Sequence, residues 1–199
     1  DLGYSYFFRR PVHDALLAKI EVTASLTLLA VTLAMLFAVP LGVVSALFRG
    51  GVLDQGIRVW TAAGLALPNF WLAIIVLLLL VRIVHWVPPM QHASLFDDPL
   101  RALQRLLLPA LIIGFRQAAA ISRMTRSMML DVLGQDYVRT ARAKGLRPAA
   151  VIMTHAFRNA LLPVVTMGGL LVMALIEGAV VIERIFTLPG IGMQLVAWV

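Results

Sequence analysis

The 199-residue chain contains no cysteine, so disulfides, thiolate nucleophiles and cysteine-based metal sites are excluded. Charged residues are also scarce: they make up 14% of the chain, against about a quarter in a typical soluble domain. Hydrophobic residues make up 61%. Because so few charges cannot cover a water-facing surface, we expect lipid to be part of the solvent.

The sequence lacks the residues that several classes of enzyme require. There is no Gly-x-x-x-x-Gly-Lys-[Ser/Thr] phosphate loop, so we do not expect an ATPase. No two histidines have metal-ligand spacing on one helix, and serines and aspartates lack a base partner for intramembrane proteolysis. The net charge of +7 comes from basic residues that flank apolar blocks, which is typical of membrane topology rather than of nucleic-acid binding. These absences argue against an enzyme, and we expect no cofactor bound by this chain.

Four apolar segments are long enough to cross a bilayer. They lie between Glu21 and Arg49, between Arg58 and Arg82, from Leu106 to Ser122, and from Ala160 to Ile182. The predicted fold class is all-α, a polytopic transmembrane helical bundle. Residues 185–199 are uncharged but interrupted by proline and glycine, which favours a re-entrant or interfacial segment.

Each apolar segment contains one proline. Prolines kink helices, so these positions could be hinges around a translocation path. Transmembrane helices also tolerate proline well, and the sequence leaves both interpretations open. The four positions are Pro40, Pro68, Pro109 and Pro163.

The distribution of basic residues predicts the orientation. The densest basic run, Arg123 to Arg158, belongs in the cytoplasm. Residues 1–21, the loop from Pro88 to Pro99 and residues 185–199 then lie outside. Since the chain opens without methionine or a signal sequence and ends within an apolar stretch, we expect the fold to be incomplete at both ends, with at least one span missing upstream.

The loop from residue 128 to 163 has the pattern helix, stop, helix. Asp136 can cap the first helix, Gly145 can take the left-handed terminating conformation, and Pro148 suits the first turn of a second helix, Ala149 to Arg158. Its arginines could engage an acidic groove of a partner. An ordinary solvated basic loop would carry the same charges, so the residues alone do not decide.

A family resemblance favours the docking interpretation. The run Asp136-Tyr-Val-Arg-Thr-Ala-Arg-Ala-Lys-Gly145, with His155-Ala-Phe-Arg-Asn-Ala160 and Leu162-Pro163, resembles the EAA loop of bacterial ABC-importer permeases. The arginine-containing triplet Arg139-Thr140-Ala141, in place of Glu-Ala-Ala, is similar to the dipeptide/oligopeptide/nickel branch. The opening Asp1-Leu-Gly is typical of its B-type subunits.

The resemblance implies a type I importer permease fold, with a permease domain over residues 22–184 in the bacterial cytoplasmic (inner) membrane. It also implies that residues 185–199 lead to a last span that is missing here. It implies that the loop from 128 to 163 couples this chain to two cytoplasmic ATP-binding subunits, which hold ATP and magnesium. It also implies a C-type permease partner, in a heterodimer, and an extracytoplasmic substrate-binding protein. Dipeptides, oligopeptides, glutathione-like compounds and nickel chelates remain open as substrates.

The same resemblance assigns the candidate site residues. The residues expected to couple to the ATPase subunit are Tyr137, Arg139, Thr140, Ala141, Arg142, Lys144, Gly145 and Arg147. The residues expected at the junction between loop and span are His155, Asn159 and Pro163.

Two ionisable residues within apolar segments are candidates for the translocation path. Glu177 is the only acidic residue inside a predicted span, and such a group is a functional candidate by default. It could equally pair with Arg116 or lie at the outer rim. Arg116 could meet a substrate carboxylate or extend its charge to the surface. The alternative function is an ion-gradient-driven carrier or channel, which would usually show an acidic relay where only Glu177 is present.

Overall fold

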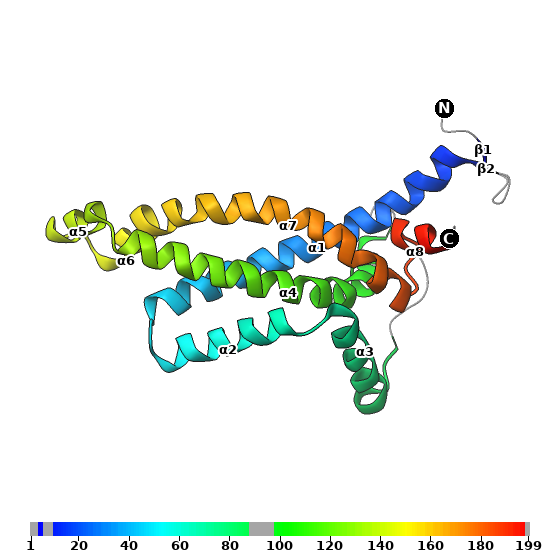
Figure 1. Ribbon diagram of the computed structural model, residues 1–199, viewed down its shortest axis with the longest axis horizontal. Coiled ribbons are helices and arrows are strands. Elements are labelled where there is room, and N and C mark those ends of the chain that lie inside the picture. The colour runs from blue at the N-terminus through cyan, green and yellow to red at the C-terminus, as the bar shows by residue number, and fades with distance from the viewer. Residues whose placement is uncertain (1–3, 6–9, 88–97, 198–199) are drawn as a thin grey trace. The chain divides into compact units, whose positions relative to one another are not determined.

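The computed structural model describes residues 4–5, 10–87 and 98–197. These residues form two compact units. Unit 1 comprises Asp1–Ala30, Pro68–Ile113 and Met173–Val199; unit 2 comprises Val31–Leu67 and Gly114–Val172. Three long helices contribute to both units: α1 (Val12–Leu47), α4 (Pro99–Leu133) and α7 (Arg158–Ile185) (Figure 1).

The all-α fold class is confirmed. The only strands in the described residues are the two-residue strands β1 (Tyr4–Ser5) and β2 (Arg10–Pro11), which pair antiparallel. The remaining helices are α2 (Val52–Ala66), α3 (Asn69–Leu79), the π-helix η1 (Leu80–Val84), α5 (Asp136–Ala143), α6 (Pro148–Ala150), the π-helix η2 (Val151–Phe157) and α8 (Ile191–Ala197).

Among the described residues, three stretches of helix are long and apolar enough to cross a membrane: Lys19–Leu47, Pro99–Leu133 and Pro148–Leu175. The first two contain the predicted first and third spans. The last contains the predicted fourth span only as far as Leu175, and the rest of that span continues in α7. The prediction of an unbroken second span is wrong, because α2 ends at Ala66 and α3 begins at Asn69. Leu67 and Pro68 between them are extended, as expected where a proline disfavours helical conformation in the preceding residue. The pair counts as a fourth span only as a broken one.

The other three span prolines lie inside continuous helices, Pro40 in α1, Pro109 in α4 and Pro163 in α7. These helices tolerate a missing backbone donor without ending. Of the four candidate hinges, only Pro68 coincides with a break in the helix.

Unit 2 is built on close approaches between helices. A Cβ atom added at Gly42 of α1 would lie 2.6 Å from the carbonyl oxygen of Ser122 in α4, and one at Gly64 of α2 would lie 2.7 Å from Cβ of Ala119. Small residues allow helix backbones to meet in this way. Trp60 of α2 adds an edge-to-face contact with Phe115 of α4, with ring centroids 5.4 Å apart. The three elements α1, α2 and α4 therefore pack tightly within this unit.

The coupling loop largely follows its predicted pattern. Gly145 ends the first helical segment with φ +77°, and Pro148 opens the next. Two details were wrong. The N-cap of α5 is Gln135, and Asp136 lies in the first turn of the helix. There its negative charge interacts favourably with the positive end of the helix dipole, but it does not cap the helix. The second helix does not end at Arg158, because α6 continues through η2 into α7.

Candidate functional site

One face of α5 is attached to the rest of unit 2. Val138 and Ala141, three residues apart and therefore on one side of the helix, are buried with Val151, and Val132 and Leu133 pack against them. Ala141, predicted as a docking residue, thus lies on the attachment side. Burial of this face fixes the orientation of α5 on the ends of α4 and η2.

A polar contact supports the same attachment. The amide of Asn159 in α7 donates to the Tyr137 hydroxyl at 3.0 Å and to the carbonyl oxygen of His155 at 2.9 Å. The structure therefore brings one predicted coupling residue together with two predicted junction residues. Pro163 lies one turn further along α7.

The opposite side of α5 and the turn after it are exposed. Arg139 forms only a long ion pair, 3.5 Å, with Asp136, and both side chains are mostly in solvent. Such an exposed pair contributes little to stability, so Arg139 is available to a partner. Tyr137 is exposed as well, although its hydroxyl contacts Asn159. The remaining exposed coupling residues are Thr140, Arg142, Lys144, Gly145 and Arg147. We call these six residues, Arg139 included, the cationic face of α5.

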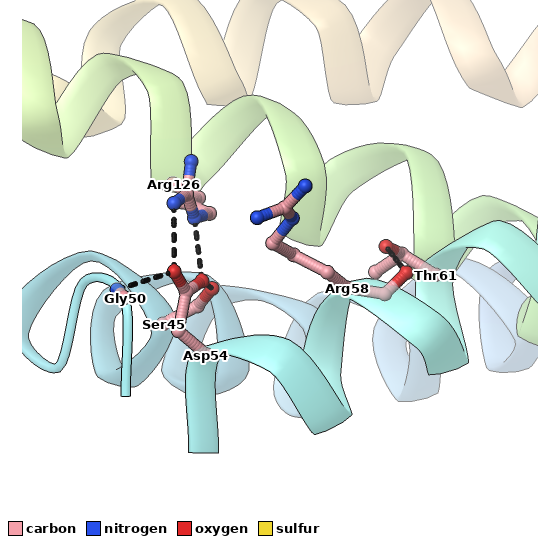
Figure 2. Close-up of polar contacts among 6 residues, drawn as sticks. All are labelled: Ser45, Gly50, Asp54, Arg58, Thr61 and Arg126. Carbon is pink, nitrogen blue, oxygen red and sulfur yellow. Dashed lines mark hydrogen bonds and ion pairs between the residues drawn. The ribbon is translucent and has the colours of Figure 1, made fainter. Parts of the chain in front are cut away.

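A buried ion pair at Asp54 escaped the sequence analysis (Figure 2). Asp54 of α2 is fully buried, and its two oxygens accept hydrogen bonds from Nε and Nη2 of Arg126 in α4 at 2.7 and 2.9 Å. Its carboxylate also accepts from the Ser45 hydroxyl at 2.5 Å and from the Gly50 amide at 2.9 Å. Bidentate hydrogen bonding of this kind is the strongest arrangement of an arginine and a carboxylate. It holds α2 to α4 and to the end of α1.

A second buried carboxylate, Glu183, organises the end of α7 in unit 1. It accepts hydrogen bonds from the Thr23 hydroxyl at 2.5 Å and from the Met193 amide at 3.1 Å. The Ile191 amide donates to the same Thr23 hydroxyl at 2.9 Å, and Gly190 lies against the carboxylate with no room for a Cβ atom. The start of α8 is thereby fixed to α7 and α1. The helix α8 itself is 7 residues long.

The structure describes the side chain of one of the two ionisable candidates for the path. Glu177 lies in α7, but its side chain is outside the described residues. Arg116 is exposed on α4 of unit 2. The buried cation of the same helix is instead Arg105 in unit 1, whose Nη2 donates to the Thr187 carbonyl oxygen at 3.0 Å while Nε and Nη1 have no partner. No local spacing in the sequence points to this contact, because Arg105 and Thr187 are 82 residues apart.

Comparison with known proteins identifies the family. The family described as binding-protein-dependent transport system inner membrane component matches residues 38–197. A putative peptide transport system permease protein of Brucella suis is 43% identical over 98% of this chain and 62% of its own length. The oligopeptide transport system permease protein AppB of Bacillus subtilis is 40% identical over 92% of this chain and 58% of its own length.

A third relative is the dipeptide transport system permease protein DppB of Escherichia coli, 38% identical over 98% of this chain. The chain spans 65% of that protein, and less than two thirds of each of the three relatives.

Proposed function

Because this chain belongs to the family of binding-protein-dependent transport system inner membrane components, we propose that it is the membrane-spanning permease subunit of an ATP-driven peptide importer. It is a multi-pass protein of the bacterial inner membrane. The peptide substrate is supported by the names of the three relatives, which transport peptides, oligopeptides and dipeptides. None of these three names mentions nickel.

The observation that carries this proposal is the two-sided construction of α5. Val138 and Ala141 attach one side to the ends of α4 and η2, and the cationic face is left to solvent. We propose that this face docks in an acidic groove of a cytoplasmic ATP-binding subunit. A helix fixed on one side transmits a push on its other side to the helices that carry it.

The proposed assembly contains two ATP-binding subunits with ATP and magnesium, a second permease subunit of the C-type and an extracytoplasmic binding protein. Residues 22–184 would be the permease domain, with residues 1–21 and 185–199 outside. Glu177 and Arg116 remain candidates for the translocation path.

The test reverses the charge of the docking face. In Arg139→Glu/Arg142→Glu, we expect the ATP-binding subunit to be lost on co-purification and ATP-dependent dipeptide uptake to fall about a hundredfold, since two close charge pairs become repulsive. Arg49→Glu/Arg158→Glu is the matched control, because both arginines are exposed, lie in the basic regions assigned to the cytoplasm and change the net charge equally. If the first variant assembles and transports normally, the docking role is wrong. Uptake driven by protons or sodium without ATP would favour a secondary carrier.

A further inference from the structure

A cavity of about 380 Å³ lies beside the Asp54–Arg126 pair in unit 2. It is lined by side chains from α1, α2 and α4. The lining residues are Ser45, Ile57, Arg58, Thr61, Ala62, Ser122, Arg123 and Arg126. We call this cavity the three-arginine pocket.

The charge of the three-arginine pocket is not balanced. Its lining residues include three arginines and no acidic residue, and the neighbouring Asp54 is already engaged by Arg126. In the part of the chain that the structure describes, Arg58 and Arg123 form no ion pair. Arg126 uses two of its five N–H donors on Asp54, so the others remain available. Figure 2 shows Arg58 extending from α2 toward α4 on the same side as Arg126.

A neutral donor also lines this cavity. The hydroxyl of Ser122 is buried, its residue only 1% exposed, and it has no hydrogen-bond partner. An unpaired buried polar group is uncommon and calls for a ligand or solvent to satisfy it. Guanidinium groups and a hydroxyl that converge on one cavity match the acceptor oxygens of a phosphate.

The position along the chain sets the depth of the pocket in the membrane. The uncharged run 22–47 of α1 ends two residues after Ser45, and the apolar run of α4 ends at Ser122, directly before Arg123. The pocket therefore lies where the apolar runs end, at the level of lipid headgroups. Since a water molecule takes up about 30 Å³ in the liquid, the cavity has room for a phosphate with an attached glycerol.

We propose that the three-arginine pocket binds a phosphate group, held by Arg58, Arg123 and the free donors of Arg126, with Ser122 as a fourth donor. An anionic phospholipid headgroup and free phosphate present the same group to these donors. Basic pockets between transmembrane helices are known to hold anionic headgroups, and this site needs no contact with the cationic face of α5.

The experiment uses the purified transporter with its partner subunits and native mass spectrometry. We expect retained phosphatidylglycerol, but not phosphatidylcholine, on the parent protein. In Arg58→Gln/Arg123→Gln, affinity should fall about tenfold for each charge-assisted contact removed. Arg49→Gln/Arg158→Gln, which removes two exposed arginines outside the pocket, should keep the parent affinity. Equal losses in both double variants would show diffuse charge attraction and overturn the proposal.

Ser122→Ala guards against a folding defect, since it keeps every charge and removes one hydroxyl. It should lower the affinity for the phosphate group severalfold and leave the melting temperature unchanged. Excess inorganic phosphate separates the two sources. If lipid stays bound in its presence, the headgroup is the ligand; if phosphate itself binds in a manner that requires Arg58 and Arg123, the ligand is soluble. If no phosphate species depends on these arginines, the pocket is not a phosphate site.

Discussion

Removing the charge of Asp54 is the sharpest test of how unit 2 is held together. Asp54→Asn keeps the shape of the side chain but replaces one acceptor oxygen with an NH₂ donor. In the structure, one carboxylate oxygen accepts from Ser45 and Nε of Arg126, and the other from Gly50 and Nη2 of Arg126. If the NH₂ takes the place of the second oxygen, it faces the Gly50 amide and Nη2 of Arg126, and both hydrogen bonds are lost. If it takes the place of the first, the Ser45 hydroxyl can turn to accept from it, but the bond from Nε of Arg126 is lost. In either orientation the partly buried Arg126 loses a hydrogen bond and its counter-charge.

The expected cost follows from that geometry. Breaking a buried ion pair by removing one partner costs about 3–5 kcal/mol, because the remaining charge is uncompensated. Ser45→Ala removes a single neutral donor and should cost about 1 kcal/mol. The exposed Asp131→Asn should change stability by less than about 0.5 kcal/mol and serves as the control. The three variants thus predict a ranking as well as a magnitude.

The assay is reversible unfolding in mixed detergent micelles, followed by tryptophan fluorescence, for which Trp60 of α2 is a local probe. A double-mutant cycle with Arg126→Gln isolates the pairwise energy. We expect the double variant to be less destabilised than the sum of the two single variants, by about 2 kcal/mol or more. Additive effects, or an Asp54→Asn variant as stable as Asp131→Asn, would refute the buried pair.

Three further predictions concern Tyr137 of α5, Gly145 and Gly190. Tyr137→Phe removes the hydroxyl that joins α5 to α7, at a cost of about 1 kcal/mol, and should lower the number of peptides imported per ATP; an unchanged ratio would mean that the hydroxyl has no part in coupling. Gly145→Ala should destabilise unit 2 by about 1–2 kcal/mol, because φ is +77° and nothing else crowds the site. Gly190→Ala should cost about 1–3 kcal/mol or more, because the new methyl group meets the Glu183 carboxylate. In the same unfolding assay, Gly169→Ala in the open part of α7 is the shared control and should be neutral or stabilising; glycine variants no worse than this control would contradict both predictions.

The features that local chemistry dictates were predictable from the sequence. Long uncharged runs can only be satisfied as membrane helices. Two of the four expected spans lie wholly within such helices, and a third lies in one as far as Leu175. Gly145 and Pro148 act through their own backbone preferences, so the stop and restart of the coupling loop could be placed to the residue. Pro68 has the same chemistry as the tolerated Pro40, and periodicity could not tell which of them breaks a helix.

The buried carboxylates could not be found in this way. Asp54 and Arg126 are 72 residues apart, and Thr23 and Glu183 are 160 apart, so no local spacing reports either pair. Glu177 was instead the predicted candidate, because acidic residues within membrane spans are functional by default. One signal for Asp54 was present: it is the only acid in the short basic connection between Arg49 and Arg58. A lone carboxylate beside apolar helices needs a partner cation.

These long-range contacts change how the proposed docking helix would work. Arg126 lies seven residues before the end of α4, about two turns, and its pair with Asp54 anchors that end to α2. On the other side, Asn159 joins Tyr137 to the start of α7. A push on the cationic face of α5 therefore reaches two helices that are each held by specific contacts, and neither end can yield by local fraying alone. The charges of α5 would choose the partner, whereas the attachments at Arg126 and Tyr137 would determine whether its motion reaches the spans.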